Sequence, residues 1–127
     1  MSLKLSGFLI FLCACSSAPS KSNSSESGKE VSISQGEQLF NVHCTSCHSA
    51  DDKRMIGPGL KNIQDRLPVP ADKYFKKYVL NNEEVYQSGD AYAIKVRNDF
   101  NGLLMPAFEN VLREEQVMEI YKFLNKK

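Results

Sequence analysis

Two thiols and an imidazole lie together in the segment Cys44-Thr45-Ser46-Cys47-His48. With two residues between them, both sulfurs can lie on one helical turn, at the spacing that suits thioether bonds to a c-type haem. The imidazole of His48 follows at once and can then bind the haem iron. The segment predicts covalent attachment of one haem c through Cys44 and Cys47, with His48 as an axial ligand of the iron.

Three other chemistries use a Cys-x-x-Cys pair. A zinc site needs two further ligands, and the only other histidine is His43, beside the pair itself. A thioredoxin-like dithiol would need alternating strands and helices around it, which the pattern does not indicate. A structural disulfide between Cys44 and Cys47 suits an exported protein but leaves His48 without a role. Haem attachment accounts for all three residues, and the disulfide stays open as an alternative.

A second axial ligand would have to approach the iron from the face opposite His48. Met105 lies far along the chain, and Pro106 after it keeps the segment extended, because a residue before proline avoids the helical region. Its neutral thioether would favour the reduced iron. Met55 is expected on the same side of the haem as His48. Met118 falls within an expected helix and is expected in the hydrophobic core. We therefore predict Met105 as the sixth ligand, with an open or otherwise filled position as the alternative.

Composition restricts the class of protein. A chain of 127 residues is long enough for one domain. It carries 16 basic and 15 acidic side chains, and without a leader that contains Lys4 the two numbers are equal. A neutral domain lacks the basic excess that nucleic acid requires, so we expect no nucleic-acid partner.

The first 30 residues predict export and tethering. Residues 1–14 have a lysine followed by a short apolar run, as in a signal peptide, and the run is too short to anchor in a bilayer by itself. The sequence Leu-Cys-Ala-Cys at residues 12–15 resembles a bacterial lipobox, which would make Cys15 the lipidated first residue. Ordinary cleavage near Ala18 is the alternative. Residues 15–30 are rich in serine and predict a flexible tether before a folded domain at 31–127.

Helical periodicity and capping residues predict an all-α domain. Ser34 begins a capping box for a helix that starts at Gln35 and reaches Cys44. The later expected elements are a helix at 71–80, a turn at 83–87, a helix at 91–98 and a helix at 114–124. In the helix at 91–98 we expect Ala91 and Ile94 to face inward, with Tyr92 and Val96 beside them. The last helix has the weak N-cap residue Arg113.

The arrangement of these motifs resembles a class I cytochrome c over about residues 34–125. The resemblance rests on the haem motif, a loop, a methionine segment and the last helix, with the residues Gly36, Phe40, Cys44-x-x-Cys47-His48, Gly57-Pro58-Gly59-Leu60 and Met105-Pro106-Ala107-Phe108. It implies a small all-α cytochrome c fold, with three to five helices wrapped around one covalent haem.

The resemblance also implies roles for residues around the cofactor. The carbonyl of Pro58 would accept a hydrogen bond from His48 and so orient the imidazole. Leu60 and Phe40 would pack beside the haem, and Arg66 would pair with a haem propionate. Tyr121 of the last helix would meet the region of Gly36 and Phe40. Gly36 itself is either the point of a close helix crossing or a tolerated first-turn glycine.

The function implied is that of a monohaem electron carrier rather than a catalyst. It would be exported, lipid-anchored through Cys15 on the periplasmic side of a bacterial membrane, and monomeric. Its redox partners would be proteins such as a membrane dehydrogenase, a quinol-oxidising complex or a terminal oxidase or reductase. The alternative is a haem enzyme or gas-binding domain in which Met105 is labile or does not bind the iron.

Overall fold

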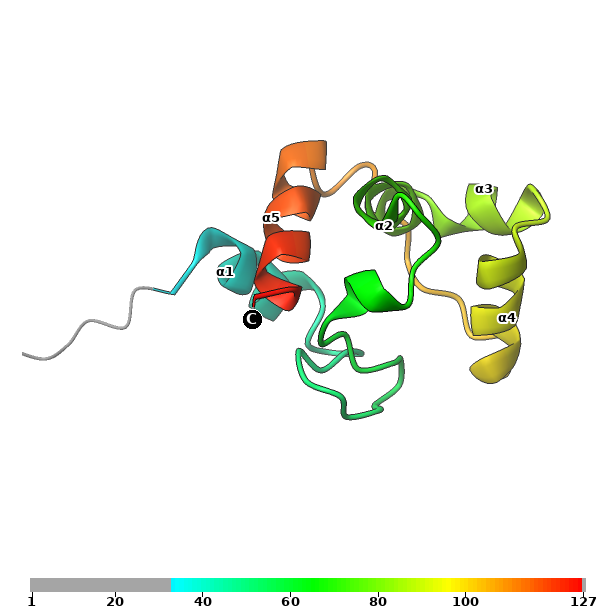
Figure 1. Cartoon of the computed structure of the whole chain (residues 1–127), viewed down its shortest axis with the longest axis horizontal. Coiled ribbons are helices and arrows are strands. Elements are labelled where there is room, and N and C mark those ends of the chain that lie inside the picture. Colours follow the sequence, from blue (N-terminus) through cyan, green and yellow to red (C-terminus); the bar gives the residue numbers. More distant parts are fainter. Residues whose placement is uncertain (1–32, 127) are drawn as a thin grey trace, which may run out of the picture. The chain divides into compact units, whose positions relative to one another are not determined.

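Helices form all the regular structure of residues 33–126, the part of the chain that the computed structural model describes (Figure 1). In chain order they are α1 (Gln35–His43), the 3₁₀ helix η1 (Ile63–Asp65), α2 (Ala71–Leu80), α3 (Asn82–Gln87), α4 (Ala91–Asp99) and α5 (Glu114–Leu124). The predicted all-α fold is confirmed. Within these residues no helix has the length and apolar character to cross a membrane. The predicted leader, lipid anchor and tether lie outside the described residues.

α1 and α5 cross at a glycine. Ser34 caps α1 through a 3.3 Å hydrogen bond from the backbone N–H of Glu37 to its hydroxyl. A Cβ atom at Gly36 would lie only 2.0 Å from the carbonyl oxygen of Glu119 in α5. The absence of a side chain at this position is therefore what lets the two backbones approach, and the close-crossing interpretation of Gly36 is confirmed.

Phe123 of α5 packs on Phe40 of α1, and the prediction that Tyr121 would meet this region was wrong. The ring centroid of Phe123 lies 5.6 Å from that of Phe40, whereas the ring of Tyr121 lies 5.2 Å from that of Phe75 in α2. Residues four apart share a side of a helix, so Glu119 and Phe123 face α1 together. Tyr121 points to a different side, where α2 packs. Periodicity alone does not say which neighbour each side meets.

The start of α5 is capped from within the helix. Arg113 offers no side-chain acceptor, as its residue type predicts. The side chain of Gln116 instead accepts a 2.9 Å hydrogen bond from the Arg113 backbone N–H. This bond is one half of a capping box and compensates in part for the weak cap.

The core lies among α1, α2 and α5. Phe40, Val117 and Ile120 are the largest side chains that are almost completely buried. They join other buried side chains from η1, α2, the segment before α5 and the end of α5, namely Ile63, Phe75, Val79, Leu112 and Leu124. One side of this core continues into the cavity described below.

α3 and α4 form a pair beyond α2 (Figure 1), and here the sequence predictions were partly wrong. The expected turn is a helix that begins at Asn82, and α4 extends one residue further, to Asp99. Ala93 is the buried residue of α4, at 1% exposure, whereas Ala91 and Ile94 are exposed. Helical periodicity therefore predicted a larger buried face on α4 than the structure has.

Candidate functional site

One cavity brings together most of the site residues that the sequence predicts within residues 33–126. Its walls come from α1, η1, α2, α4 and α5 and from the segments that follow α1 and α4. The walls are mostly aliphatic and aromatic, and none of the lining residues carries a carboxylate, guanidinium or ammonium group. Such a lining suits a large, flat, apolar molecule held by a few polar groups.

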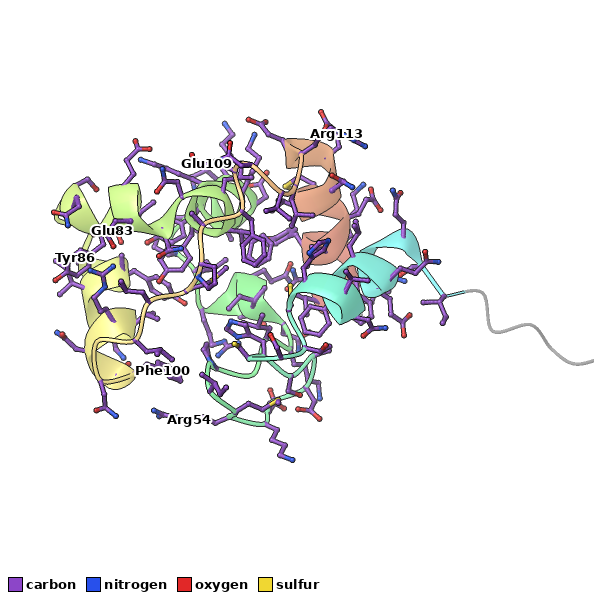
Figure 2. The ribbon with its side chains drawn as sticks, turned by 180° about the vertical axis from the view of Figure 1, so that it is seen from behind. Arg54, Glu83, Tyr86, Phe100, Glu109 and Arg113 are labelled. Atoms are coloured by element: carbon purple, nitrogen blue, oxygen red, sulfur yellow. The ribbon has the colours of Figure 1, made fainter. Side chains whose placement is uncertain are left out.

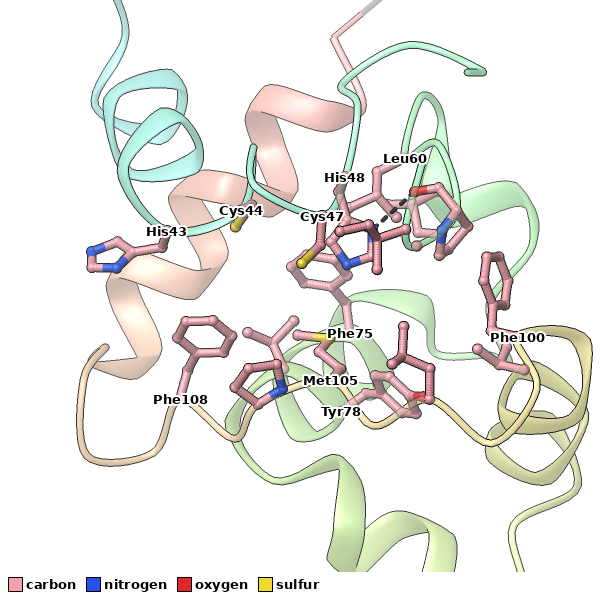
Figure 3. Close-up of a pocket in the computed structure, with 18 of the residues that line it drawn as sticks. His43, Cys44, Cys47, His48, Leu60, Phe75, Tyr78, Phe100, Met105 and Phe108 are labelled. Atoms are coloured by element: carbon pink, nitrogen blue, oxygen red, sulfur yellow. Dashed lines mark hydrogen bonds between the residues drawn. The ribbon is translucent and has the colours of Figure 1, made fainter. Parts of the chain in front are cut away.

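The two cysteines lie where α1 ends. Cys44 is the residue that closes the helix, and the backbone N–H groups of Cys47 and His48 both donate to its carbonyl, at 3.1 and 2.9 Å. This tight turn places both thiols on one wall of the cavity (Figure 3). Both thiols are free, so the alternative disulfide is not formed. Burial, together with the nearby Cys47, raises the pKa of the Cys44 thiol to about 11.

His48 is held on the same wall by the Gly57-Pro58 loop. Its Nδ1 lies 2.9 Å from the Pro58 carbonyl oxygen, as the dashed line in Figure 3 marks, so Nδ1 carries the proton and donates. Nε2 is left without a proton and free to act as a ligand. Burial lowers the pKa of His48 more than the bond to Pro58 raises it, which keeps the imidazole neutral. The contact implied by the resemblance is therefore present.

A glycine packs flat against the His48 ring. A Cβ atom at Gly57 would lie 2.4 Å from Cε1 and 2.8 Å from Nδ1 of His48. The backbone N–H of Gly57 also donates to the Cys47 carbonyl at 2.8 Å, which ties the loop to the thiol turn. The ring is thus confined on one side by backbone and on its Nδ1 edge by a hydrogen bond.

Met105 faces the cavity from the opposite side, on the segment between α4 and α5 (Figure 3). Of the three methionines within residues 33–126, it alone lines this cavity. Met55 lies in a separate hollow beside Phe40 and is 43% exposed, and Met118 is partly buried in α5. Met118 is thus not among the core residues, contrary to expectation.

The remaining predicted site residues lie in different places. Leu60 lines the cavity, as expected. Phe40 does not: its ring turns toward Phe123 and lies in the core at 1% exposure. Arg66 is also absent from the lining, and its guanidinium donates a 2.6 Å hydrogen bond to the carbonyl of Gly59. In this structure Arg66 supports the loop that carries Pro58.

One contact that sequence reasoning missed joins the two sides of the cavity. Arg54, in the loop after His48, donates a 2.8 Å hydrogen bond to the carbonyl of Asp99 at the end of α4. Its guanidinium carbon also lies 4.1 Å from the ring centroid of Phe100, which lines the cavity (Figure 2). The two partners are 45 residues apart, and no sequence pattern pairs them.

Comparisons with known proteins agree with this geometry. The family model described as "Cytochrome c" matches residues 33–126. Cytochrome c-551 from Bacillus subtilis is 31% identical over 67 residues, which cover 50% of this chain and only 60% of that relative.

Solved structures extend the likeness to most of the chain. A cytochrome c from Rhodothermus marinus is 31% identical with a TM-score of 0.58, covering 84% of this chain and 86% of that one. An engineered form of it, described as bound to a carbene intermediate, is also 31% identical, with a TM-score of 0.57 and coverage of 84% and 87%.

The cavity residues fit haem c, the cofactor that this family binds covalently. The uncharged walls match an apolar macrocycle, and the two thiols lie together at one edge. A neutral imidazole nitrogen and a thioether face the interior from opposite sides (Figure 3). These are donor types that hold haem iron in electron-transfer proteins.

Proposed function

We propose that this chain, which belongs to the cytochrome c family, carries single electrons on one covalently attached haem c. The observation that carries the proposal is the cavity in which Cys44, Cys47 and His48 share one wall and Met105 faces them. Haem iron supplies a one-electron couple between Fe(III) and Fe(II). A site with two strong axial ligands needs no substrate contact at the metal, which suits a carrier rather than a catalyst.

Each residue of the site has a distinct part in the proposal. Cys44 and Cys47 would hold the haem through thioether bonds, and His48 would bind the iron through Nε2. Pro58 would orient the imidazole, because its 2.9 Å contact with Nδ1 fixes the tautomer and makes the ligand nitrogen, Nε2, more basic. Leu60 would pack against the haem from the same loop.

Met105 would complete the coordination from the other side. A thioether is a neutral, soft ligand, so it stabilises Fe(II) relative to Fe(III) and raises the reduction potential. The apolar walls act in the same direction, because a low local dielectric disfavours the additional positive charge of Fe(III). We therefore expect a potential in the upper part of the range for haem proteins.

The setting of the carrier is also a proposal. The lipobox-like sequence before Cys15 supports export and lipid anchoring on the periplasmic side of a bacterial membrane. The serine-rich residues 16–30 would let the domain reach membrane-bound redox partners, with a root-mean-square span of about 20 Å for a flexible coil of this length. A dehydrogenase, a quinol-oxidising complex or a terminal oxidase or reductase would fit such an arrangement.

The function is tested by spectra of the protein matured with its haem. Reduced pyridine haemochrome spectra report thioether-bound haem, and the oxidised protein should show a sulfur-to-iron charge-transfer band. In Met105→Ala that band should disappear and the reduction potential should fall, because the thioether ligand is lost.

Met55→Ala and Met118→Ala are matched controls, since both remove a methionine that lies outside the cavity. Both should keep the band. A band that survives in Met105→Ala would contradict the assignment of the sixth ligand. A c-type haem without the band in the unaltered protein would favour the gas-binding or catalytic alternative. Absence of haem would contradict the proposal and favour a disulfide or a metal site at Cys44 and Cys47.

A further inference from the structure

A buried amide supports the segment that carries Met105. Asn82 is the first residue of α3 and is 4% exposed. It is the single buried polar residue within the described part of the chain. A buried polar side chain costs free energy unless its hydrogen bonds are made, so the contacts of Asn82 deserve a physical explanation.

Those contacts go to the backbone carbonyl groups of two consecutive residues, Met105 and Pro106. Nδ2 of Asn82 donates to the Met105 carbonyl oxygen at 2.9 Å and approaches the Pro106 carbonyl oxygen at 3.4 Å. Among residues 33–126, no other side chain hydrogen bonds to residues 103–107. Pro106 has no N–H of its own, so this stretch has fewer ways to attach to the rest of the fold.

Within residues 33–126, backbone hydrogen bonds hold the rest of the segment only at its two ends. On the α4 side, the N–H of Leu103 donates to the Phe100 carbonyl at 3.0 Å. On the α5 side, the N–H of Phe108 donates to the Leu80 carbonyl, also at 3.0 Å. Between these two anchors, Asn82 is the link between the Met105 backbone and the helices.

We propose that Asn82 is a positioning residue for Met105, and this inference rests on the proposed role of Met105 as an iron ligand. By holding the Met105 carbonyl, the amide keeps the thioether directed into the cavity. Without the amide, the segment samples conformations in which the thioether is withdrawn. A competing ligand then binds the oxidised iron more tightly, because its apparent affinity rises with the fraction of molecules in which the sixth position is free.

The test compares imidazole binding to the oxidised, haem-loaded protein and its variants by absorbance titration. Asn82→Ala and Asn82→Leu both remove the donor, and leucine keeps a side chain of similar size. Each should increase the apparent affinity for imidazole about tenfold, the effect expected from loss of one buried hydrogen bond. Each should also weaken the sulfur-to-iron band and lower the reduction potential.

Asn81→Ala is the matched control. The Asn81 side chain caps α3 by accepting from the Glu84 N–H at 3.1 Å and donates to Glu109 at 3.2 Å, but it does not contact Met105. This variant should lower the stability of α3 while leaving the imidazole affinity and the band unchanged. An effect of Asn81→Ala equal to that of Asn82→Ala would overturn the proposal in favour of a general loosening of α3.

The Met105→Ala variant distinguishes a wrong role for Asn82 from a wrong assignment of Met105 as the iron ligand. If Met105→Ala loses the band while both Asn82 variants keep the band and the imidazole affinity of the unaltered protein, only the role of Asn82 is refuted. If Met105→Ala keeps the band, Met105 is not the ligand and the role of Asn82 falls with it. A weaker band and tighter imidazole binding in both Asn82 variants, with neither effect in Asn81→Ala, would support the proposal.

Discussion

At the residue scale, the site is defined by how little freedom His48 has. The imidazole is confined by the Pro58 carbonyl at 2.9 Å and by the backbone of Gly57, where even a methyl group would collide with the ring. The neutral tautomer with Nε2 free is the form that binds a metal. A ligand that is oriented before the cofactor arrives has less conformational entropy to lose when it binds.

Substitution of Gly57 tests this confinement. In Gly57→Ala the Cβ atom would lie 2.4 Å from Cε1 of His48, so the ring or the loop must shift. We expect a lower yield of haem-loaded protein and a destabilisation of about 1–3 kcal/mol, the usual cost of overpacking. Pyridine haemochrome yield and urea unfolding measure the two effects.

Gly89→Ala is the control for the loss of a glycine. Gly89 has a positive φ of 79° but no heavy atom within 4 Å of the position of a Cβ. This variant should cost only about 1 kcal/mol of backbone strain and leave the haem yield unchanged. Equal haem yields in the two variants would contradict a steric role for Gly57.

At the element scale, α4 is attached to α2 and α3 by contacts at its start and near its end. Asp90 caps its start by accepting from the Ala93 N–H at 2.8 Å and from the Tyr74 hydroxyl of α2 at 2.5 Å. The guanidinium of Arg97 lies 3.4 Å from the ring centroid of Tyr86 and 2.5 Å from the carboxylate of Glu83, and these contacts join α4 to α3. Because Tyr92 and Val96 line the cavity, these contacts also hold one of its walls.

Asp90 should make this attachment sensitive to pH. Burial by itself would raise the pKa of Asp90, but hydrogen bonds from Tyr74 and backbone N–H groups outweigh it and lower the pKa. The stabilising contribution is therefore complete at neutral pH and is lost as the pH falls through the lowered pKa. Asp90→Ala should cost about 1 kcal/mol at neutral pH, the typical value of an N-cap.

Urea unfolding at neutral and at acidic pH checks this expectation. The difference between Asp90→Ala and the unaltered protein should shrink at acidic pH, because the carboxyl is then protonated in both the folded and the unfolded chain. Asp52→Asn removes an exposed carboxylate, 3.6 Å from Lys61, and should change stability little at either pH. A difference for Asp90→Ala that stays constant with pH would argue against the proposed charge effect.

At the scale of the whole molecule, the described residues form one domain around an uncharged cavity. The formal net charge of the chain is +1, so long-range electrostatic attraction to a partner is weak. The proposed lipid anchor would replace such attraction by keeping the carrier close to the membrane. Restriction to a surface raises the effective concentration of membrane-bound partners.

The anchor is tested with the two cysteines of the leader region. Cys15→Ser should abolish labelling with a radioactive fatty acid and release the protein from membranes, because the lipidated thiol is lost. Cys13→Ser is the matched control and should remain labelled, since this residue would leave with the leader. Labelled protein in the Cys15→Ser variant would refute the lipoprotein proposal.

Elements with local signals could be predicted from the sequence alone. The bounds of α2 and α5 agree with residues 71–80 and 114–124 of the structure, and α1 begins at Gln35 as its cap predicts but ends at His43, one residue before the predicted end. The cofactor chemistry was also readable, because both thiols and the imidazole lie within five residues. Such features depend on short-range geometry that every copy of the motif shares.

Which helix surfaces meet could not be predicted without the folded structure. Phe123 rather than Tyr121 packs on Phe40 of α1, Ala93 is the residue buried in α4, and Arg54 bonds to Asp99 across 45 residues of chain. The contact of Asn82 with Met105 belongs to the same class, because an asparagine after a helix predicts a cap or a turn and nothing more. Contacts between distant segments depend on the path of the whole chain, since a helical repeat specifies a buried face but not its neighbour.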